Sequence, residues 1–446
     1  MMTWKELAVE NASELYEEAL ALQPVMVGWR RTLHRRPECG LQVPNTSAFV
    51  QERLVELGIP FATLLNGNCV VAIIGHGGPY IMLRADIDGL PIREQSGEPF
   101  SSENGCMHAC GHDLHTASLL GAAALLKRRE ANLRGTVKLL FQPAEETFEG
   151  ARAAVAVGVL ENPQVNAALG LHAESRTPVG TVRFGGVTMA SAYGFRITVT
   201  GKGGHGSTPE NCVDPIVAAI KIHEALETLM SREKSPFAEA VLTIGKFQAG
   251  DAANVIPEQA VMEGTLRAFD PDQRAFLVER IAQIAPAVAA TYRATARVET
   301  LTDVPELRND DALVRECLAA ATAAIPNANP VGGLHAMGSE DFAIVAQRVP
   351  TAYFMLGARV DGEARFAADH AANGHLATGK SACCQETFSA SSAVAPGDRG
   401  IPDAVSEANG PFGHHTSRVR FSEGYLPQAA TIYVASALNW LVNHGR

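Results

Sequence analysis

Residues 69–88 read CVVAIIGHGGPYIMLRADID, which is two apolar runs joined by a glycine-rich turn. Short runs rich in Val, Ile and other large apolar side chains are typical of buried strands. The second run ends in two carboxylates, Asp86 and Asp88. We therefore predict two strands of a sheet that is covered on both faces, with acidic side chains where the second strand ends.

Strands and helices alternate on both sides of this segment. A helix is predicted at residues 45–57, with Asn45 placed to cap its start and Gly58 its end. The alternation continues with a helix at 114–126 and strands at 137–141 and 167–171. This order indicates an α/β fold with a mixed, mostly parallel sheet.

A different pattern occupies residues 191–302. Its order is strand, helix, strand, strand, helix, strand, which is typical of a ferredoxin-like α+β domain. The α/β pattern resumes afterwards, so we predict that residues 1–190 and 303–446 form one discontinuous domain around this insertion. Within its second part, residues 358–413 are rich in small and polar side chains and are predicted to form a long loop excursion.

The composition excludes several functional classes. The net charge of the 446 residues is −11 without a dense Lys/Arg stripe, which argues against a nucleic-acid partner. No apolar run approaches the roughly 18 residues that a membrane span needs, and the N-terminus lacks the pattern of a secretion signal. The eight cysteines are mostly scattered, unlike a disulfide framework. We therefore expect a cytoplasmic, reduced protein that acts on a small molecule, without a membrane partner.

Residues 106–117, CMHACGHDLHTA, concentrate two cysteines, three histidines and an aspartate just before a predicted helix. Thiolate and imidazole are ligands suited to zinc or a similar divalent ion, and the helix N-terminus favours a deprotonated Cys110. The same residues are also compatible with a reactive thiol or with a redox pair, Cys106 and Cys110. The segment therefore predicts a metal site and leaves a thiol site as the alternative.

Further polar residues follow two of the predicted strands. Glu145 and Glu146 come directly after residues 137–141, and His172 ends the strand at 167–171. Neighbouring carboxylates diverge, so one can bind a metal while the other acts as a general base on a water molecule. Paired glutamates more often form a solvated surface, and a single histidine is more often a packing residue. Their position at strand ends, where α/β sheets place their sites, favours the functional interpretation.

In this order, the segments resemble the metal-dependent amidohydrolase branch of the aminoacylase and carboxypeptidase peptidase superfamily, which includes hippurate hydrolases, N-acyl-amino-acid deacylases and auxin-conjugate hydrolases. The resemblance covers nearly the whole chain. Its landmarks are RRTLHRRPE from Arg30, LRADIDGLPI from Leu83, MHACGHDLHTA from Met107, FQPAEE from Phe141, GLH from Gly170, GKGGHGSTP from Gly201, DAANVIP from Asp251, GTLRAF from Gly264 and MGSEDFA from Met337.

The resemblance implies a catalytic domain with a zinc-exopeptidase-like fold and two divalent ions. Zinc or manganese is expected there, with cobalt and nickel as alternatives. Glu145 is implied as the general base and Asp88 as the carboxylate that orients a ligand. The implied ligands are Cys110 as the bridge, His112, Glu146, His172 and His415. For the last ligand His414 is the alternative, and Arg420 stands where the family usually has aspartate.

The resemblance further implies that residues 191–302 are a lid that also forms a homodimer. His205 would stabilise the developing oxyanion from the partner subunit. Asn254 and Arg267 would contact substrate, and the Arg267 guanidinium suits a carboxylate. From the residues alone, Asn254 could equally close a turn, and Arg267 could pair with an acid on a solvated strand.

The chain departs from the family pattern at several positions, which puts the exact substrate in doubt. Tyr193 and Glu210 replace an acidic residue and a histidine that the family often has there. Residues 358–413 are several times longer than usual, and lead into His415. The Cys383–Cys384 pair, His370 and His375 within them suggest either loop residues or an extra metal site.

The expected function is hydrolysis of an amide-type C–N bond in a small carboxylate-bearing substrate, an N-acyl amino acid or an aromatic amide conjugate. The alternatives among enzymes are a hydrolytic deaminase of an aromatic amine, such as an aminobenzoate-type compound, and a dipeptidase. A catalytically silent binding homologue should have lost some of these site residues. A thiol-dependent redox enzyme should keep its activity when metals are chelated.

Overall fold

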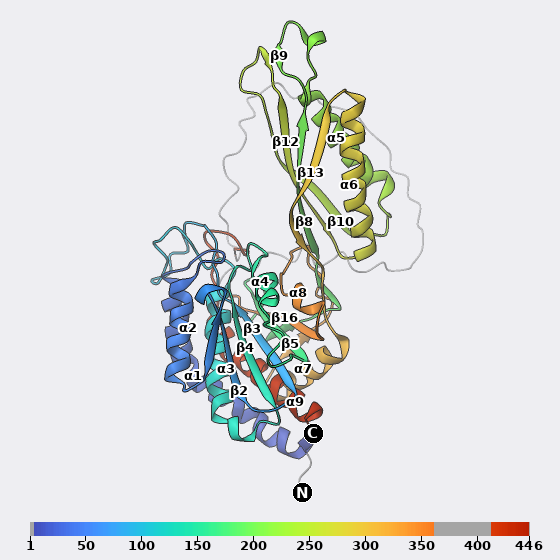
Figure 1. Ribbon diagram of the computed structural model, residues 1–446. Helices are drawn as coiled ribbons and strands as arrows, with labels where there is room; N and C mark the ends of the chain where they lie inside the picture. The colour runs from blue at the N-terminus through green and yellow to red at the C-terminus, as the bar shows by residue number, and fades with distance from the viewer. Residues whose placement is uncertain (1–3, 361–411, 446) are drawn as a thin grey trace, which may run out of the picture.

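A computed structural model describes residues 4–360 and 412–445 (Figure 1). Residues 361–411, most of the predicted excursion, lie outside the described residues. The other sequence features that fall there are the Cys383–Cys384 pair, His370 and His375. Figure 1 shows a wide α/β body that holds both ends of the chain and a narrower body that projects from it. In the described part of the chain, no helix is long and apolar enough to cross a membrane.

A mixed sheet forms the centre of the wide body. Among the described residues its strands are β1 (Phe61–Leu64), β2 (Cys69–Gly75), β4 (Thr136–Gln142), β3 (Tyr80–Asp86), β5 (Ala167–Glu174), β16 (Thr351–Gly357), β6 (Thr181–Arg183) and β15 (Asn329–Val331), in this spatial order. β3 is parallel to both of its neighbours, and β16 is parallel to β5, whereas β1 and β2 are antiparallel. The predicted α/β class with a mostly parallel sheet is confirmed.

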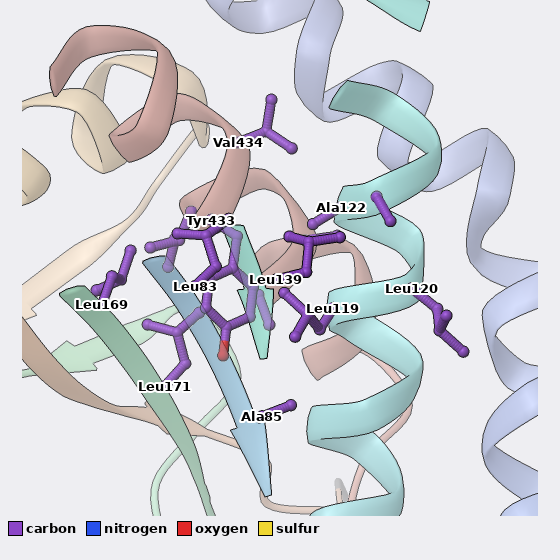
Figure 2. Packing of buried hydrophobic residues seen from close by; sticks show 14 of the residues in the cluster. Leu83, Ala85, Leu119, Leu120, Ala122, Leu139, Leu169, Leu171, Tyr433 and Val434 are labelled. Carbon is purple, nitrogen blue, oxygen red and sulfur yellow. The ribbon is translucent and has the colours of Figure 1, made fainter. Parts of the chain in front are cut away.

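Helices cover both faces of this sheet. One face carries α1 (Trp4–His34), α2 (Pro44–Glu56), α3 (His112–Arg128), α7 (Asp311–Ala324) and α9 (Tyr425–His444), and the other carries α4 (Gly150–Ala156) and α8 (Ala343–Ala346). Leu83 and Ala85 of β3 point into the first core, and Met82 points into the second, because successive side chains of a strand alternate between faces. Figure 2 shows Leu83 and Ala85 packed beside Leu119 of α3 and Tyr433 of α9.

The narrower body has a sheet and a core of its own. Its strands are β10 (Ala240–Ala249), β12 (Gln259–Ala268), β8 (Ser191–Thr200) and β13 (Thr295–Val304) in spatial order, and its helices are α5 (Pro215–Thr228) and α6 (Pro271–Thr291). This strand order and the chain order βαββαβ are those of a ferredoxin-like fold. β8 begins at Ser191 and β13 ends at Val304, close to the predicted boundaries at residues 191 and 302. The domain boundaries themselves stay a prediction. We call residues 191–302 the lid domain, after the role that the sequence resemblance implied for them and that stays a prediction.

Short strand pairs complete the fold. β9 (Gly204–His205) and β11 (Val255–Ile256) pair at the end of the lid domain that lies far from the wide body (Figure 1). β7 (Val187–Met189) and β14 (Leu307–Arg308) pair where the chain passes between the two bodies.

The start of α2 differs from the prediction, because Asn45 does not cap it. Instead the Glu38 carboxylate accepts hydrogen bonds from the backbone N–H groups of Asn45 (3.2 Å) and Thr46 (2.8 Å). A carboxylate from the preceding turn thus satisfies N–H groups that lack a partner within the helix. The other end is as predicted: Gly58 has a φ of +66°, and its N–H donates to the carbonyl oxygen of Val55.

Candidate metal centre

The predicted ligands gather at the carboxyl ends of β4 and β5, beside the start of α3. Glu146 follows β4, and His172 lies near the end of β5. Cys110 lies just before α3, and His112 is the first residue of that helix. Because β3 separates β4 from β5 and runs parallel to both, their ends meet at one edge of the sheet, as the sequence predicted.

His112 and His172 each present one ring nitrogen to this centre, because a backbone carbonyl holds the other. Nδ1 of His112 donates to the carbonyl oxygen of Asp88 (2.9 Å), and Nδ1 of His172 donates to that of Ala173 (2.7 Å). A carbonyl oxygen can only accept, so the neutral form of each ring carries its lone pair on Nε2. Burial lowers the pKa of His172 well below its ordinary value and keeps that ring neutral. Metal-binding histidines are commonly held in this way.

Two buried polar atoms of the centre have no hydrogen-bond partner among the described residues. They are Nε2 of His112 and Oε1 of Glu146, which lie 3.8 Å apart. Sγ of Cys110 completes a group of donor atoms close enough to hold one ion, and it also lies 3.4 Å from Nε2 of His172. Burying polar atoms without a partner costs free energy of folding. A divalent cation bound between them would remove that cost. The residues present therefore fit divalent ions, and the bridging role of Cys110 stays a prediction.

Asp88 holds several of these groups in place. Its carboxylate accepts hydrogen bonds from the backbone N–H groups of Glu145 (3.1 Å) and Glu146 (3.2 Å). Its backbone carbonyl fixes the His112 ring, as described above. Asp88 therefore links the loop after β3 to the loop after β4, and its positioning role stays a prediction.

The Glu145 side chain is buried within a group of acids. Its carboxylate and those of Glu340 and Asp341 lie close enough together to share an ion. Burial raises the pKa of Glu145 well above its ordinary value, and the charges of Glu340 and Glu146 add to the effect. Oε2 of Glu145 lies 3.9 Å from Nε2 of His112. A carboxylate with a raised pKa beside the ligands is suited to accept and return a proton.

Arg84 counters this negative charge from behind the centre, a role that sequence reasoning missed. Its guanidinium is buried and pairs with Asp86 (2.8 Å), Glu340 (3.0 Å) and Asp341 (3.0 Å). The only sequence signal was its place in β3, two residues before Asp86, where a cation interrupts an apolar run. The charge partners could not be inferred, because two of them follow more than 250 residues later.

His115 lies near the centre but is not free to bind an ion. Its Nε2 accepts a hydrogen bond from the backbone N–H of Ala173 (2.8 Å), and its Nδ1 donates to Asp86 (2.5 Å). Both ring nitrogens are therefore occupied. His115 acts instead as a support that joins α3 to β3 and β5.

His414 and His415 lie on two sides of the centre. By distance alone, His414 forms a group with Cys110 and His172. Its Nε2, however, accepts a hydrogen bond from the backbone N–H of Ser175 (3.2 Å), so the proton of the neutral ring sits on Nδ1, 4.0 Å from Sγ of Cys110. Burial lowers the pKa of His414 to about 3, with the charge of His415 adding to the effect. In this tautomer Nδ1 of His414 is a donor toward Sγ of Cys110, which favours His415 over His414 as the predicted last ligand.

The more exposed His415 approaches the ligands from the other side. Its Nε2 lies 3.3 Å from Oε2 of Glu146, and its backbone N–H donates to the carbonyl oxygen of Ala109 beside Cys110. An ion held by Glu146 would therefore lie within reach of this nitrogen. His415 stays the predicted last ligand.

The two histidines are expected to differ when each is replaced by alanine. His415→Ala should leave one ion site empty even with excess metal, because a ligand atom is lost. His414→Ala should still bind two ions, with an affinity lowered by about 10- to 100-fold, because only a supporting contact is lost. Metal content after dialysis against graded metal concentrations measures both. An empty ion site in His414→Ala, with two ions still bound in His415→Ala, would identify His414 as the ligand.

A cavity of about 380 Å³ opens onto the centre. It contains the Arg267 guanidinium, whose Nη1 donates to the carbonyl oxygen of Met337 (3.0 Å) and to Oγ of Ser339 (2.9 Å). Its other nitrogens make no hydrogen bond within the described residues. The lining residues are Cys110, Glu145, Glu146, Phe148, His172, Met189, Arg267, Met337, Gly338, Ser339, Glu340, Tyr353, Met355, His414 and His415. The structure thus brings Arg267 to the predicted ligands.

His205 and Asn254 are not brought to the centre within one chain. His205 pairs with Val255 in the β9–β11 ribbon, and the carbonyl oxygen of Asn254 accepts a hydrogen bond from the N–H of Gly206. Both lie at the far end of the lid domain (Figure 1). Asn254 lies in the turn before β11, neither residue lines the described cavity, and their roles stay predictions.

The positions that depart from the family pattern also lie away from this cavity. Tyr193 is buried in the lid core, and its hydroxyl lies 3.2 Å from Oγ1 of Thr300. Glu210 is exposed, and Nε of Arg420 donates to Glu98 (2.6 Å). Among the described residues, these differences therefore do not reshape the surface next to the ligands.

Comparisons with known proteins identify the family. The model of peptidase family M20/M25/M40 matches residues 82–383. N-acetylcysteine deacetylase of Bacillus subtilis is 40% identical over 74% of this chain and 88% of its own length, and IAA-amino acid hydrolase ILR1-like 4 of Arabidopsis thaliana is 38% identical over 77% and 80%. The crystal structure of the Bacillus subtilis YXEP protein, a dinuclear metal-binding peptidase from the M20 family, is 32% identical, covers 95% of this chain and 99% of its own, and has a TM-score of 0.72. The resemblance seen in the sequence landmarks is thus confirmed, and the chain belongs to peptidase family M20/M25/M40.

Proposed function

We propose that this protein is a two-metal hydrolase that cleaves the amide bond of small N-acyl amino acids, with zinc or manganese as the ions. The observation that carries the proposal is the pair of unpartnered buried atoms, Nε2 of His112 and Oε1 of Glu146, beside the Cys110 thiol. Thiolate and imidazole favour zinc, and carboxylate accommodates manganese. These atoms lie next to a cavity that also holds a candidate base and an arginine.

The substrate class follows from the two ends of the cavity. Arg267 has guanidinium N–H groups left to bind a carboxylate, and the cavity between it and the ligands is lined by Phe148, Met189 and Met355. An acyl amide with a carboxylate on the amine side matches this combination of cation and apolar surface. The names of the B. subtilis and A. thaliana relatives, a deacetylase of N-acetylcysteine and a hydrolase of amino-acid conjugates, support the same class.

The chain's own residues then have distinct tasks. Cys110, His112, Glu146, His172 and His415 would hold two divalent ions, which when bound would supply an acidified water molecule and a polarised scissile carbonyl. The Glu145 carboxylate takes the proton of the attacking water and returns it to the amine nitrogen that leaves. Asp88 keeps Glu145 and Glu146 in place through their backbone N–H groups. Arg267 fixes the substrate carboxylate, which aligns the amide with the base.

The same proposal assigns His205 to the active site of a homodimer. His205 is exposed at the far end of the lid domain, where it cannot serve the centre of its own chain in this arrangement. In a dimer formed through the lid domains, His205 of the partner subunit would reach the scissile carbonyl and stabilise its oxyanion. Asn254, hydrogen-bonded to the adjacent Gly206, would enter the site with it.

The proposal is tested with metal-reconstituted protein and a substrate panel. The panel contains N-acetyl and N-benzoyl amino acids, the same amides without the carboxylate, dipeptides and an aminobenzoate-type aryl amine. Preferred hydrolysis of the N-acyl amino acids, lost with EDTA and restored with zinc or manganese, is expected. Preferred turnover of dipeptides or release of ammonia from the aryl amine would replace the proposed substrate class, and turnover that survives EDTA would contradict the metal mechanism.

Arg267→Gln is expected to raise KM for N-acyl amino acids by about 10- to 100-fold, because a hydrogen bond to a charged group is worth about 1.5–3 kcal/mol. Turnover of the matching amide without a carboxylate should change little, because that substrate never used the guanidinium. Arg196→Gln is a matched control, since Arg196 pairs with Glu263 on the lid surface. Equal losses for both substrates would show that Arg267 holds the fold and not the carboxylate.

A further inference from the structure

Two thiols from distant parts of the chain meet beside the metal centre. Sγ of Cys39 and Sγ of Cys106 lie 2.8 Å apart, although 67 residues separate them in the sequence. Both side chains are half-buried and neither is in a disulfide. A disulfide bond is about 2.05 Å long, so a small rotation of the two side chains would bring the sulfurs to bonding distance.

The backbone around this pair is already held together. Cys39 forms an isolated parallel bridge with Gly89, whose N–H donates to the carbonyl oxygen of Glu38 (2.7 Å). Met107, next to Cys106, exchanges two backbone hydrogen bonds with Leu90, at 2.8 and 2.9 Å. The segment that follows β3 therefore pairs with the backbone at Cys39 and with the backbone next to Cys106. A covalent link between the sulfurs needs little backbone movement.

The thiol pair lies next to groups that build the metal centre. Gly89 directly follows Asp88, and the loop that carries Cys106 continues into Cys110. The sequence left open a redox pair of Cys106 with Cys110. In the structure the partner of Cys106 is Cys39, whereas Sγ of Cys110 lies against Nε2 of His172. The proximal thiol pair is thus separate from the predicted bridging thiolate.

We propose that Cys39 and Cys106 form a reversible disulfide when the protein meets hydrogen peroxide or a low-molecular-weight disulfide, and that this bond braces the metal-binding loop. With peroxide, the Cys106 sulfur attacks one oxygen, the O–O bond breaks, and a sulfenic acid forms with release of water. The Cys39 sulfur then attacks the sulfenic sulfur, so that the S–S bond forms, the S–O bond breaks and a second water leaves. In total two thiols lose two electrons and two protons, and one peroxide is reduced to two waters.

The order of the two steps follows from the surroundings of Cys39. Burial raises the pKa of its thiol to about 12, and the Cys106 thiol and the carboxylates of Asp88 and Glu146 add to the effect. The thiolate is the reacting species, so the buried Cys39 thiol is assigned the second, resolving step. A dithiol reductant, such as a thioredoxin-type protein or dithiothreitol, reduces the disulfide to the two thiols by thiol–disulfide exchange.

The bond should stabilise the protein without stopping catalysis. The disulfide closes a loop of 67 residues and thereby lowers the conformational entropy of the unfolded chain. For a chain of this size, this corresponds to a rise in Tm of roughly 5 °C. Because the flanking backbone already pairs, the ligands should stay in place and activity should change by less than about twofold. A braced loop should also release its ions to a chelator more slowly.

Metal-loaded protein is treated with hydrogen peroxide or with oxidised glutathione, alkylated, digested without reduction and analysed by mass spectrometry. The expected product is a linked peptide that contains Cys39 and Cys106 and separates on reduction. The oxidised protein should gain about 5 °C in Tm over the reduced one. Cys39→Ser should lose both signals, and Cys69→Ala, which alters a buried thiol of β2, should keep them.

Cys106→Ser repeats the test if Cys39→Ser does not fold. Alkylation of both thiols after oxidation would overturn the proposal, and so would a linked peptide with Cys110 in place of Cys39. A Tm gain that persists in both serine variants would show that oxidation stabilises the protein elsewhere and would equally contradict it. None of these readouts requires the substrate to be known.

Discussion

Replacing Glu145 with glutamine is expected to lower kcat by about 10³-fold while both ions remain bound, because general acid–base catalysis contributes about 10²- to 10⁴-fold. Glutamine keeps the size of the side chain and the backbone N–H that Asp88 holds. It removes the oxygen that accepts the proton of the attacking water and returns it to the leaving amine. KM should change little, since the proposal assigns the substrate carboxylate to Arg267, which the substitution leaves unchanged.

The measurement combines steady-state kinetics on the preferred N-acyl amino acid with metal content. Glu149→Gln is the matched control, because Glu149 is an exposed glutamate a few residues further along the same loop. Its kcat should stay within about twofold of the unmodified protein. If Glu145→Gln with two ions bound retained more than a tenth of the activity, another group would have to move the proton.

Replacing Cys110 with alanine is expected to abolish activity and to leave less than one ion bound per chain. The Cys110 side chain lies close to the His112 and Glu146 pair and also to His172. Removing it therefore takes a ligand from both ions at once, and the remaining neutral imidazoles and carboxylate hold each ion with fewer donors. Because ions bind only the folded state, the variant should also lose the increase in Tm that added metal gives the unmodified protein.

Cys317→Ala is the control for this variant, because Cys317 is a buried thiol of α7 away from the centre. It should bind two ions and keep its activity. EDTA treatment of the unmodified protein should reproduce the loss, and added zinc or manganese should reverse it. Two tightly bound ions in Cys110→Ala would show that the thiolate does not bridge them.

Features that depend on a few neighbouring residues could be predicted from the sequence. The apolar runs at 69–75 and 80–86 became β2 and β3, and the order of elements in 191–302 became the ferredoxin-like sheet of the lid domain. The error at Asn45 has the same origin, since a local cap was assumed where the Glu38 carboxylate reaches the helix start from the preceding turn. A local sequence pattern predicts where an element lies more reliably than it predicts which groups bind the backbone N–H groups at the start of that element.

By itself, the sequence determined the sheet, the insertion, the strand ends that lead to Glu146 and His172, and the helix start beside Cys110 and His112, because residue periodicity and the geometry of parallel strands are enough to bring the strand ends to one edge. Only the tertiary structure decided which nitrogen of each histidine is available, how His414 differs from His415, and that Cys39 meets Cys106. These depend on hydrogen bonds and contacts between segments far apart in the chain, which no local pattern encodes. The groups that pack around a histidine ring or a thiol decide which ring nitrogen is protonated and which group the thiol contacts. These neighbours are brought together only when the chain folds.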